Sequence, residues 1–255
     1  MAKTPTIRRM SDITSQRITA LNSGTVETTV LTECLAVDFA QLMRNTLSFV
    51  SPQALHLLSE ASKTGITARM TLAAQLLHTH PQTNLEELSK HASDTVRGWA
   101  CYYIGQQDNM SLAEKLTLIR PLANDSHFGV REWSWLAMRK DIIAQPEETL
   151  SLLLPWTKDS SDKIRRFACE AIRPRGVWCA HFTLLKKQPE LALPILDALR
   201  SDSSVYVQDS VANWLNDASK SSPDWVQTVC DRWLNECNTP ATIRICKRAL
   251  RTINK

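Results

Sequence analysis

The chain has 255 residues, of which 43% are hydrophobic and 22% are charged, so it is long enough to bury a sizeable core. The formal net charge is only +4, which permits a basic surface patch and does not require one. Glycine is scarce, and residues that favour helix over strand dominate, which predicts an all-α fold. No apolar run approaches the roughly 18 to 20 residues of a membrane helix, so we expect no membrane association and a cytoplasmic protein.

The seven cysteines form no Cys-x-x-Cys pair and lie mostly at apolar helical positions, which predicts reduced core thiols. No Walker loop, dinucleotide-binding glycine pattern or His-Glu-x-x-His motif occurs, and the sequence predicts no cofactor and no metal. His78 and His80 stand before Pro81 without a nearby third ligand. This pattern favours the end of a helix over a metal site.

The first 47 residues divide into a segment with little apolar periodicity and a segment with helical periodicity. Residues 1–24 show no sustained apolar period except between Ile13 and Leu21, so we predict a loosely ordered N-terminal segment followed by one domain over residues 25–255. Residues 27–47 carry apolar side chains at helical spacing and fit one or two helices.

Two further helices are predicted before residue 80. Ser51 and Pro52 form a cap and first-turn pair for a helix that runs to about Ala61, and Gly65 precedes a helix from Ala68 to Leu77. We interpret this part of the chain as an atypical first repeat or a cap of the repeat array.

A regular repeat follows. An aliphatic residue, an arginine and then an aromatic residue two positions later recur around Arg97, Arg131 and Arg165, which are 34 residues apart, and weaker copies lie at Gln208 and Arg244. A polar residue stands six positions before each copy: His91, Asp125, Asp159, Asp202 and Asn238. Leucine-rich helices are predicted before the last four copies, over residues 112–122, 147–156, 190–199 and 224–234.

Each repeat is therefore a helix, a short polar turn and a second helix. Such units cannot bury their apolar faces alone, so we predict a HEAT-like α-solenoid of antiparallel helix pairs. This packing by itself explains Arg97, Arg131 and Arg165 as residues that cap helices or pair across repeats.

The repeat is interrupted once. The spacing from Arg165 to Gln208 is 43 residues, nine more than the period, and the extra residues fall in the stretch 163–181. This stretch begins as an amphipathic helix that Pro174 and Gly176 should break. Regular packing would keep the period, so the insertion indicates a function.

The side chains that this turn should expose suit a nucleic acid. Arg173, Arg175 and Trp178 would project from an irregular turn, where arginine can contact a phosphate backbone and tryptophan a flat base or sugar. Trp133 and Trp135 differ by two positions and so face different sides of a helix. We therefore expect one of these two tryptophans to point towards the inner surface of the solenoid.

Three segments resemble a known family: the run from Arg166 to Trp178, the run from Ser210 to Asp217, and the Ser-Pro-Asp that begins at Ser222. They are similar to the DNA alkylation repair glycosylases of the AlkC and AlkD superfamily, and most to the AlkC branch. The similarity is distinctive over residues 160–225 and diffuse over residues 25–160.

The resemblance implies both a fold and an activity. It implies a HEAT-like solenoid with a concave basic face that holds double-stranded DNA, and a monofunctional enzyme that removes alkylated bases such as 3-methyladenine without metal or cofactor. We expect the protein to act as a monomer. N-alkylation makes the base a cationic leaving group, so a carboxylate assists by stabilising the oxocarbenium-like sugar and orienting water.

Matching positions in the family pattern imply roles for individual residues. Trp178 would pack on the lesion nucleotide, and Asp217 would stabilise the charge of the sugar or position water. The residues predicted to bind DNA are Arg166, Arg173, Arg175, Lys220 and Trp133. The alternatives are that Asp217 caps the turn after its helix and that Trp178 is a wedge between helices.

The chain departs from the family pattern at one position. The AlkC pattern has an acid immediately before a Phe-x-aliphatic-Arg run, and this chain has His127 there, with Asp125 and Glu132 as the nearest acids. Either Glu132 replaces the missing acid, and is then a third catalytic residue beside Asp217 and Trp178, or the site lacks one carboxylate.

Two other functions remain open. A catalytically silent paralogue could bind damaged or branched DNA by shape and charge, which the histidine at position 127 favours. A protein-interaction scaffold, as many HEAT arrays are, is compatible with the modest net charge.

Overall fold

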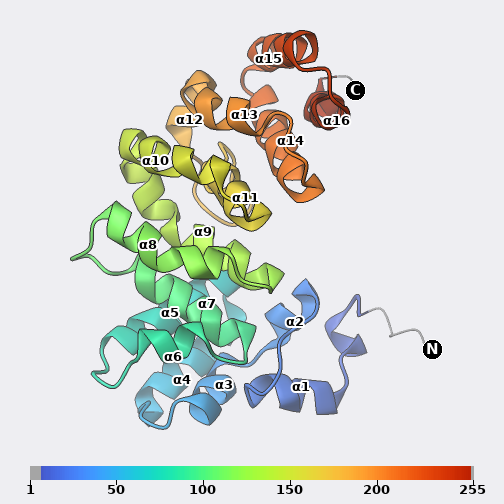
Figure 1. The fold of residues 1–255 in the computed structure, drawn as a ribbon. Helices are drawn as coiled ribbons and strands as arrows, with labels where there is room; N and C mark the ends of the chain where they lie inside the picture. The colour runs from blue at the N-terminus through green and yellow to red at the C-terminus, as the bar shows by residue number, and fades with distance from the viewer. Residues whose placement is uncertain (1–6, 254–255) are drawn as a thin grey trace. The chain divides into compact units, whose positions relative to one another are not determined.

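The computed structural model describes residues 7–253, which form helices joined by turns (Figure 1). No strand occurs among these residues, which confirms the predicted all-α class. Within the same residues, no helix combines the length and the apolar character needed to span a bilayer. The chain divides into two compact units, one made of residues 1–109 and 125–137 and the other of residues 110–124 and 138–255. The prediction of a single domain over residues 25–255 stays a prediction.

Among the described residues, the first unit contains seven α-helices of its own and the start of α9. They are α1 (Ser15–Asn22), α2 (Leu31–Ala36), α3 (Phe39–Thr46), α4 (Pro52–Glu60), α5 (Ile66–His78), α6 (Leu85–Ser89), α7 (Asp94–Gly105) and the first ten residues of α9 (Phe128–Ala144). Side chains at several helix starts accept hydrogen bonds from the first turn, as Thr14, Asp38, Ser51 and Asn84 do for α1, α3, α4 and α6. The predicted start at Ser51 is therefore confirmed.

The N-terminal segment holds one ordered helix where the sequence has its apolar period. Helix α1 buries Leu21, and Arg17 on α1 donates to both carboxylate oxygens of Glu33. Residues 1–6, which belong to the segment predicted to be loosely ordered, lie outside the described residues.

The second unit contains α8 and the elements that follow residue 137. Its helices are α8 (Leu112–Ala123), the rest of α9, α10 (Pro146–Leu153), α11 (Asp162–Glu170), α12 (Thr183–Lys187), α13 (Leu193–Leu199), α14 (Val205–Ser219), α15 (Pro223–Glu236) and α16 (Pro240–Ala249). Helix α14 packs against both α11 and α16, and Figure 1 shows the three helices side by side in yellow, orange and red. The four leucine-rich helices are present, although α10 and α13 are extended by 3₁₀ turns over Leu154–Lys158 and Pro189–Ala192.

The repeated arginines hold the turns that precede their own helices. Arg97 donates to the carbonyl oxygens of His91 and Ala92, at 2.7 and 3.2 Å, and to the carboxylate of Asp125. Arg165 repeats this pattern one unit later, with two carbonyl oxygens and the carboxylate of Asp202.

Two further copies repeat the hydrogen bonds to carbonyl oxygens of the preceding turn. Arg131 donates to the carbonyl oxygens of Asp125 and Ser126, and Gln208 donates to that of Asp202. The interpretation of these arginines as capping and pairing residues is confirmed.

In three repeats the aspartate six positions earlier orders the turn before the following helix. The carboxylates of Asp125, Asp159 and Asp202 each accept the backbone N–H two residues later, at 2.7 to 2.8 Å. The aspartate thus orders its own turn, and at positions 125 and 202 it also binds an arginine of the preceding repeat.

The tryptophans are mostly core residues, and one expectation about them is wrong. Trp99, Trp214 and Trp233 are fully buried. Trp133 and Trp135 are only 5% and 8% exposed, so neither presents the free face that we expected of one of them. Trp133 fills the space over Gly98 of α7, where an added Cβ atom would come within 2.5 Å of its ring. A helix inside a stack is covered on more than one side, so side chains about 200° apart can both be buried.

Five of the seven cysteines are buried, as predicted for core thiols, while Cys179 and Cys237 are partly exposed. No pair of them forms a disulfide in the described residues. Burial raises the pKa of the Cys34 thiol to about 12, against a lowering contribution from the Thr28 hydroxyl, so this thiol is unreactive at neutral pH.

Candidate functional site

The insertion forms a turn over residues 171–182, between α11 and α12 in the second unit. Helix α11 ends at Glu170, four residues before Pro174, and the N–H of Phe182 returns to the carbonyl oxygen of Pro174 at 3.1 Å. The predicted helix break is therefore present. The turn is closed by its own backbone and is not an open connection.

Asp217, near the C-terminal end of α14, binds this turn through its carboxylate. One oxygen, Oδ2, accepts from Nε and Nη2 of Arg173 at 2.9 and 2.6 Å, and the other, Oδ1, accepts from Nζ of Lys220 at 3.1 Å. Arg175 adds hydrogen bonds to the carbonyl oxygen of Asp217 and to Oγ of Ser221. The structure thus brings together four residues that the sequence analysis selected: Arg173, Arg175, Asp217 and Lys220.

Glu170 is the acid at this site that the sequence reasoning missed. It is 3% exposed and accepts from Nη1 of Arg173 at 2.8 Å and from Oγ of Ser210 at 2.6 Å, while Arg166 lies 3.6 Å away. Burial raises its pKa, but the charges of Arg166 and Arg173 and the Ser210 hydrogen bond outweigh burial, so the pKa lies below its ordinary value. The sequence signal that could have identified Glu170 is its position, four residues after Arg166 and three before Arg173.

The cationic side chains of the site differ in how many partners within the protein they bind. Arg173 joins Glu170 and Asp217, and these two carboxylates raise its pKa although burial opposes them. Arg166 lies over the ring of Tyr206, 4.5 Å from its centroid. The Lys220 side chain is 43% exposed and donates one of its three ammonium N–H groups to Asp217.

Trp178 is the exposed aromatic residue of the turn. It is 45% exposed, and the neighbouring Val177 is 81% exposed, whereas most other large apolar side chains of the described residues are buried. The alternative in which Trp178 wedges between helices would bury it, so the exposure favours a surface role.

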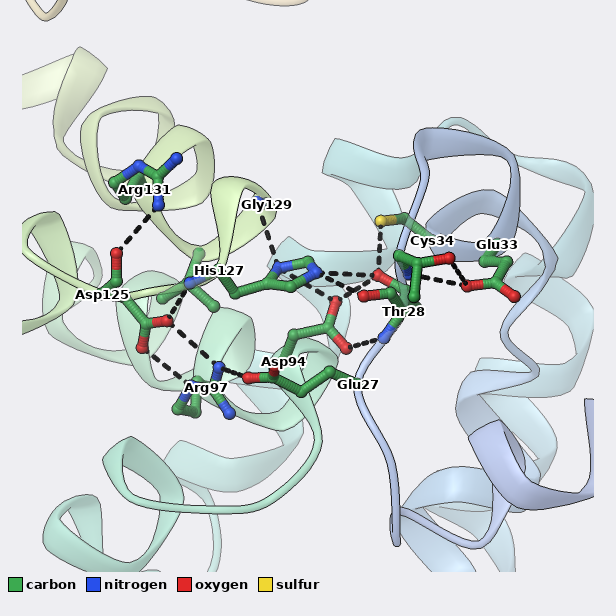
Figure 2. A network of polar contacts seen from close by, with 12 residues as sticks. Glu27, Thr28, Glu33, Cys34, Asp94, Arg97, Asp125, His127, Gly129 and Arg131 are labelled. Carbon is green, nitrogen blue, oxygen red and sulfur yellow. Dashed lines mark hydrogen bonds and ion pairs between the residues drawn. The ribbon is translucent and has the colours of Figure 1, made fainter. Parts of the chain in front are cut away.

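His127, in the first unit, stands where the family pattern has an acid, and it caps α9 (Figure 2). The N–H of Gly129 donates to Nδ1 at 3.1 Å, so the proton lies on Nε2, which donates to the carbonyl oxygen of Thr28 at 2.7 Å. Both ring nitrogens therefore serve the fold.

A buried acid, Asp94, lies beside His127. Its Oδ2 is 3.5 Å from Nδ1 of His127, and its carboxylate accepts from the N–H and the hydroxyl of Thr28 at 2.9 and 2.8 Å. Asp94 is fully buried, so no ligand reaches it in this structure. Arg97 pairs with Glu27 and Asp125 in the same network, which joins the residues before α2 to α7 and α9 (Figure 2).

Glu132, the candidate for the missing acid, lies on α9 in the first unit, whereas Asp217 and Trp178 belong to the second. Its Oε2 accepts from Nε1 of Trp135 at 3.0 Å. A role for Glu132 in catalysis stays a prediction.

The fold defines the class of the protein as a HEAT-like α-solenoid. Residues 81–173 match the model of HEAT repeats, and residues 132–245 match the model of the family described as DNA alkylation repair enzyme. The predicted resemblance to DNA alkylation repair proteins is thus confirmed over residues 132–245, where that family model matches.

One curated relative and two solved structures are similar to this chain over different shares of its length. The uncharacterized protein YhaZ of Bacillus subtilis is 36% identical over 137 residues, a match that covers 54% of this chain and 37% of that protein. The alkylpurine DNA glycosylase AlkC of Pseudomonas fluorescens, solved bound to DNA containing an abasic site analog, is 22% identical with a TM-score of 0.70, covering 98% of this chain and 66% of that one. AlkD2 of Streptococcus mutans is 21% identical with a TM-score of 0.56, covering 85% of this chain and 98% of that one. At these identities the structural likeness establishes the fold.

Proposed function

We propose that the protein is a DNA glycosylase that hydrolyses the N-glycosidic bond of alkylated, cationic bases such as 3-methyladenine in double-stranded DNA. The observation that carries the proposal is the Asp217 carboxylate, oriented by Arg173 and Lys220 beside the turn that exposes Trp178. All of these residues lie within the part that matches the DNA alkylation repair family.

The hydrogen bonds of Asp217 leave it capacity for this chemistry. A carboxylate has about four acceptor positions, and Asp217 uses two on Oδ2 and one on Oδ1. The remaining position on Oδ1 can orient a water towards the sugar. The negative charge stabilises the oxocarbenium character that develops as the cationic base departs.

Phosphate binding falls mainly to Arg175 and Lys220. Arg173 is committed to two acids, so its role is to fix Asp217 rather than to meet the backbone of DNA. Arg175 uses two of its five donors within the protein, and Lys220 uses one of three. These free donors can bind phosphate oxygens.

Release of methylated bases from treated duplex DNA tests the proposal. We expect the wild type to release such bases and Asp217→Asn to lose at least about 100-fold in single-turnover rate, because removal of one electrostatic stabiliser costs about that much. Asp231→Asn, at an exposed acid of the same unit outside the segments that resemble the family, is the matched control and should keep the wild-type rate. A wild type that frees no modified base while an active glycosylase does would contradict the proposal.

A second function, non-catalytic recognition of damaged or branched DNA, is favoured by a specific observation. Both ring nitrogens of His127 are used in capping, and the Asp217 charge is balanced by two cations. In that case Asp217→Asn should bind duplex DNA as the wild type does, and no base should be released. Glu132→Gln provides a further arm, since it lowers the excision rate only if Glu132 replaces the missing acid.

A further inference from the structure

Arg139, on α9 in the second unit, is a buried arginine to which the proposed function assigns no role. Its Nη1, Nη2 and Nε donate to the carbonyl oxygens of Ala171, Arg173 and Ala180, at 2.7, 2.6 and 3.1 Å. The residue is only 3% exposed, and its guanidinium lies over the ring of Phe182, 5.6 Å from the centroid. Arg139 is therefore packed against the inserted turn and bound to its backbone.

The three carbonyl oxygens lie on both limbs of the turn. Ala171 and Arg173 precede the break at Pro174, and Ala180 stands on the limb that returns to α12. Burial lowers the pKa of Arg139, so the charge is held inside the protein at a cost that these hydrogen bonds offset. One side chain thus fixes the two limbs relative to each other.

Arg173 connects this contact to the Asp217 carboxylate. The backbone of Arg173 is held at both ends, because its N–H donates to the carbonyl oxygen of Glu170 at 3.2 Å and its own carbonyl oxygen accepts from Arg139. Its side chain donates to Oδ2 of Asp217 from Nε and Nη2, at 2.9 and 2.6 Å. Asp217 is therefore oriented by a side chain whose backbone Arg139 holds in place.

Arg69, in the first unit, makes a similar contact outside the candidate site. Its Nη1 and Nη2 donate to the carbonyl oxygens of Val37 and Leu35, both at 3.2 Å, and its guanidinium lies 4.9 Å from the centroid of the Phe39 ring. It is 7% exposed, and burial lowers its pKa as it lowers that of Arg139. The two arginines share their surroundings and differ in what the bound backbone carries.

We propose that Arg139 is a positioning residue of the glycosylase, which keeps the Asp217 carboxylate in its reactive orientation through the backbone of Arg173. The inference rests on the proposed function, because Asp217 is the residue that acts in both. Displacement of a catalytic group by about 1 Å can cost on the order of 100-fold in rate, so this contact affects the reaction as well as the stability.

Single-turnover base release by Arg139→Lys tests this role. A lysine ammonium keeps the charge, but it is a point charge that cannot reproduce the planar fork of a guanidinium on three carbonyl oxygens. We expect the rate to fall by about 10- to 100-fold while the affinity for duplex DNA changes by no more than about threefold, because the misplaced group acts in the transition state.

Arg69→Lys is the matched control. It weakens the same kind of contact in the first unit, so it should lower the midpoint of urea unfolding comparably and keep the wild-type rate of base release. Equal losses of rate in Arg69→Lys and Arg139→Lys would mean that a general loss of stability explains both, and would overturn the proposal. A wild-type rate in Arg139→Lys would overturn it as well.

Cys179 provides a readout that needs no activity. This partly exposed thiol belongs to the turn, and a Cβ atom added at Gly176 would collide with its Sγ. Burial raises the pKa of Cys179, although the charge of Arg139 opposes the shift. A looser turn in Arg139→Lys should expose the thiol, so iodoacetamide should modify Cys179 faster than in the wild type, while Cys237, the other partly exposed thiol, reacts as before.

The two measurements separate this inference from the proposed function. If the wild type releases no base, the glycosylase proposal fails, and faster modification of Cys179 in Arg139→Lys still supports Arg139 as the residue that sets the turn. Equal modification of Cys179 in the wild type and in Arg139→Lys shows that the turn does not depend on Arg139 and overturns the inference whether or not base is released.

Discussion

At the scale of single residues, arginines lower the pKa of two buried acids, Glu33 and Glu170. Glu33 accepts from Nε and Nη2 of Arg17 at 2.7 and 2.8 Å and from the N–H of Thr29 at 2.6 Å. The Arg17 hydrogen bonds lower the pKa of Glu33 from 4.5 to about 2, with burial opposing them and Thr29 adding to them. Glu33 therefore ties the segment before α2 to α1.

This shift predicts how stability depends on pH. A carboxyl group whose pKa is depressed by folding contributes stability above pH 4.5, and that contribution is lost as the pH falls towards 2. At about 1.4 kcal/mol per pKa unit, the shift from 4.5 to about 2 corresponds to at most about 3.5 kcal/mol. Urea unfolding of wild type and Glu33→Gln should therefore differ at pH 6 and converge by pH 2; a constant difference would contradict the assignment.

Glu170 shows why part of the site could not be predicted from the sequence. Its arginine neighbours at three and four residues are a pattern that many solvent-exposed helices share. What distinguishes it is burial beneath the turn and the hydroxyl of Ser210, forty residues away. Asp217 and the insertion could be found by family resemblance and by the broken period, but the acid that joins them depends on contacts between distant segments.

At the scale of helices, the ladder of arginines and aspartates should govern the stability of individual repeats. Arg165 makes two hydrogen bonds to carbonyl oxygens and pairs with both oxygens of Asp202, whereas Gln208 makes one hydrogen bond to a carbonyl oxygen at the equivalent place. The two positions therefore differ in the ion pair with Asp202 and in one hydrogen bond to a carbonyl oxygen.

Substitution at the two positions should separate the contributions. Arg165→Met leaves Asp202 without its partner and should cost about 2 to 4 kcal/mol of unfolding free energy, while Gln208→Ala should cost about 1 kcal/mol. Denaturant unfolding of both variants checks this. Equal losses would show that the carbonyl hydrogen bonds, and not the ion pair, stabilise the turns.

The helices themselves followed the sequence closely, because capping residues and apolar periods are local. Ser51 caps α4 as predicted, and α8 and α15 have the predicted extents within two residues. The burial of both Trp133 and Trp135 did not follow, and for Trp133 it depends on the gap that Gly98 leaves on α7. Local sequence patterns define where the helices begin and end, whereas packing against neighbouring helices decides which of their side chains are buried.

At the scale of the whole chain, a net charge of +4 means that affinity for DNA must come from a local excess of cations. One such excess lies at the end of the second unit, where Arg244 and Arg248 share the single acid Asp209 and Arg251 binds the neutral Asn213. Of these arginines, Arg248 and Arg251 are the more exposed.

The salt dependence of DNA binding tests this excess. If Arg248 and Arg251 each meet a phosphate, Arg248→Gln with Arg251→Gln should lower the slope of log affinity against log salt by about 2. Lys158→Gln with Lys187→Gln removes the same charge from exposed positions of the same unit and should leave the slope unchanged. If both double variants lower the slope equally, DNA binding depends on the net charge of the protein and not on the positions of Arg248 and Arg251.

Arg139 of α9 donates three hydrogen bonds to carbonyl oxygens of the turn over residues 171–182. This contact has a consequence for how the insertion can evolve. Without the nine extra residues, a buried guanidinium would face no carbonyl oxygens, and without the guanidinium, three carbonyl oxygens of the turn would be left unpaired. Neither change is tolerable alone, so arginine and insertion must be gained or lost as a pair. Among relatives, those that keep the regular 34-residue spacing should carry an apolar residue where this chain has Arg139.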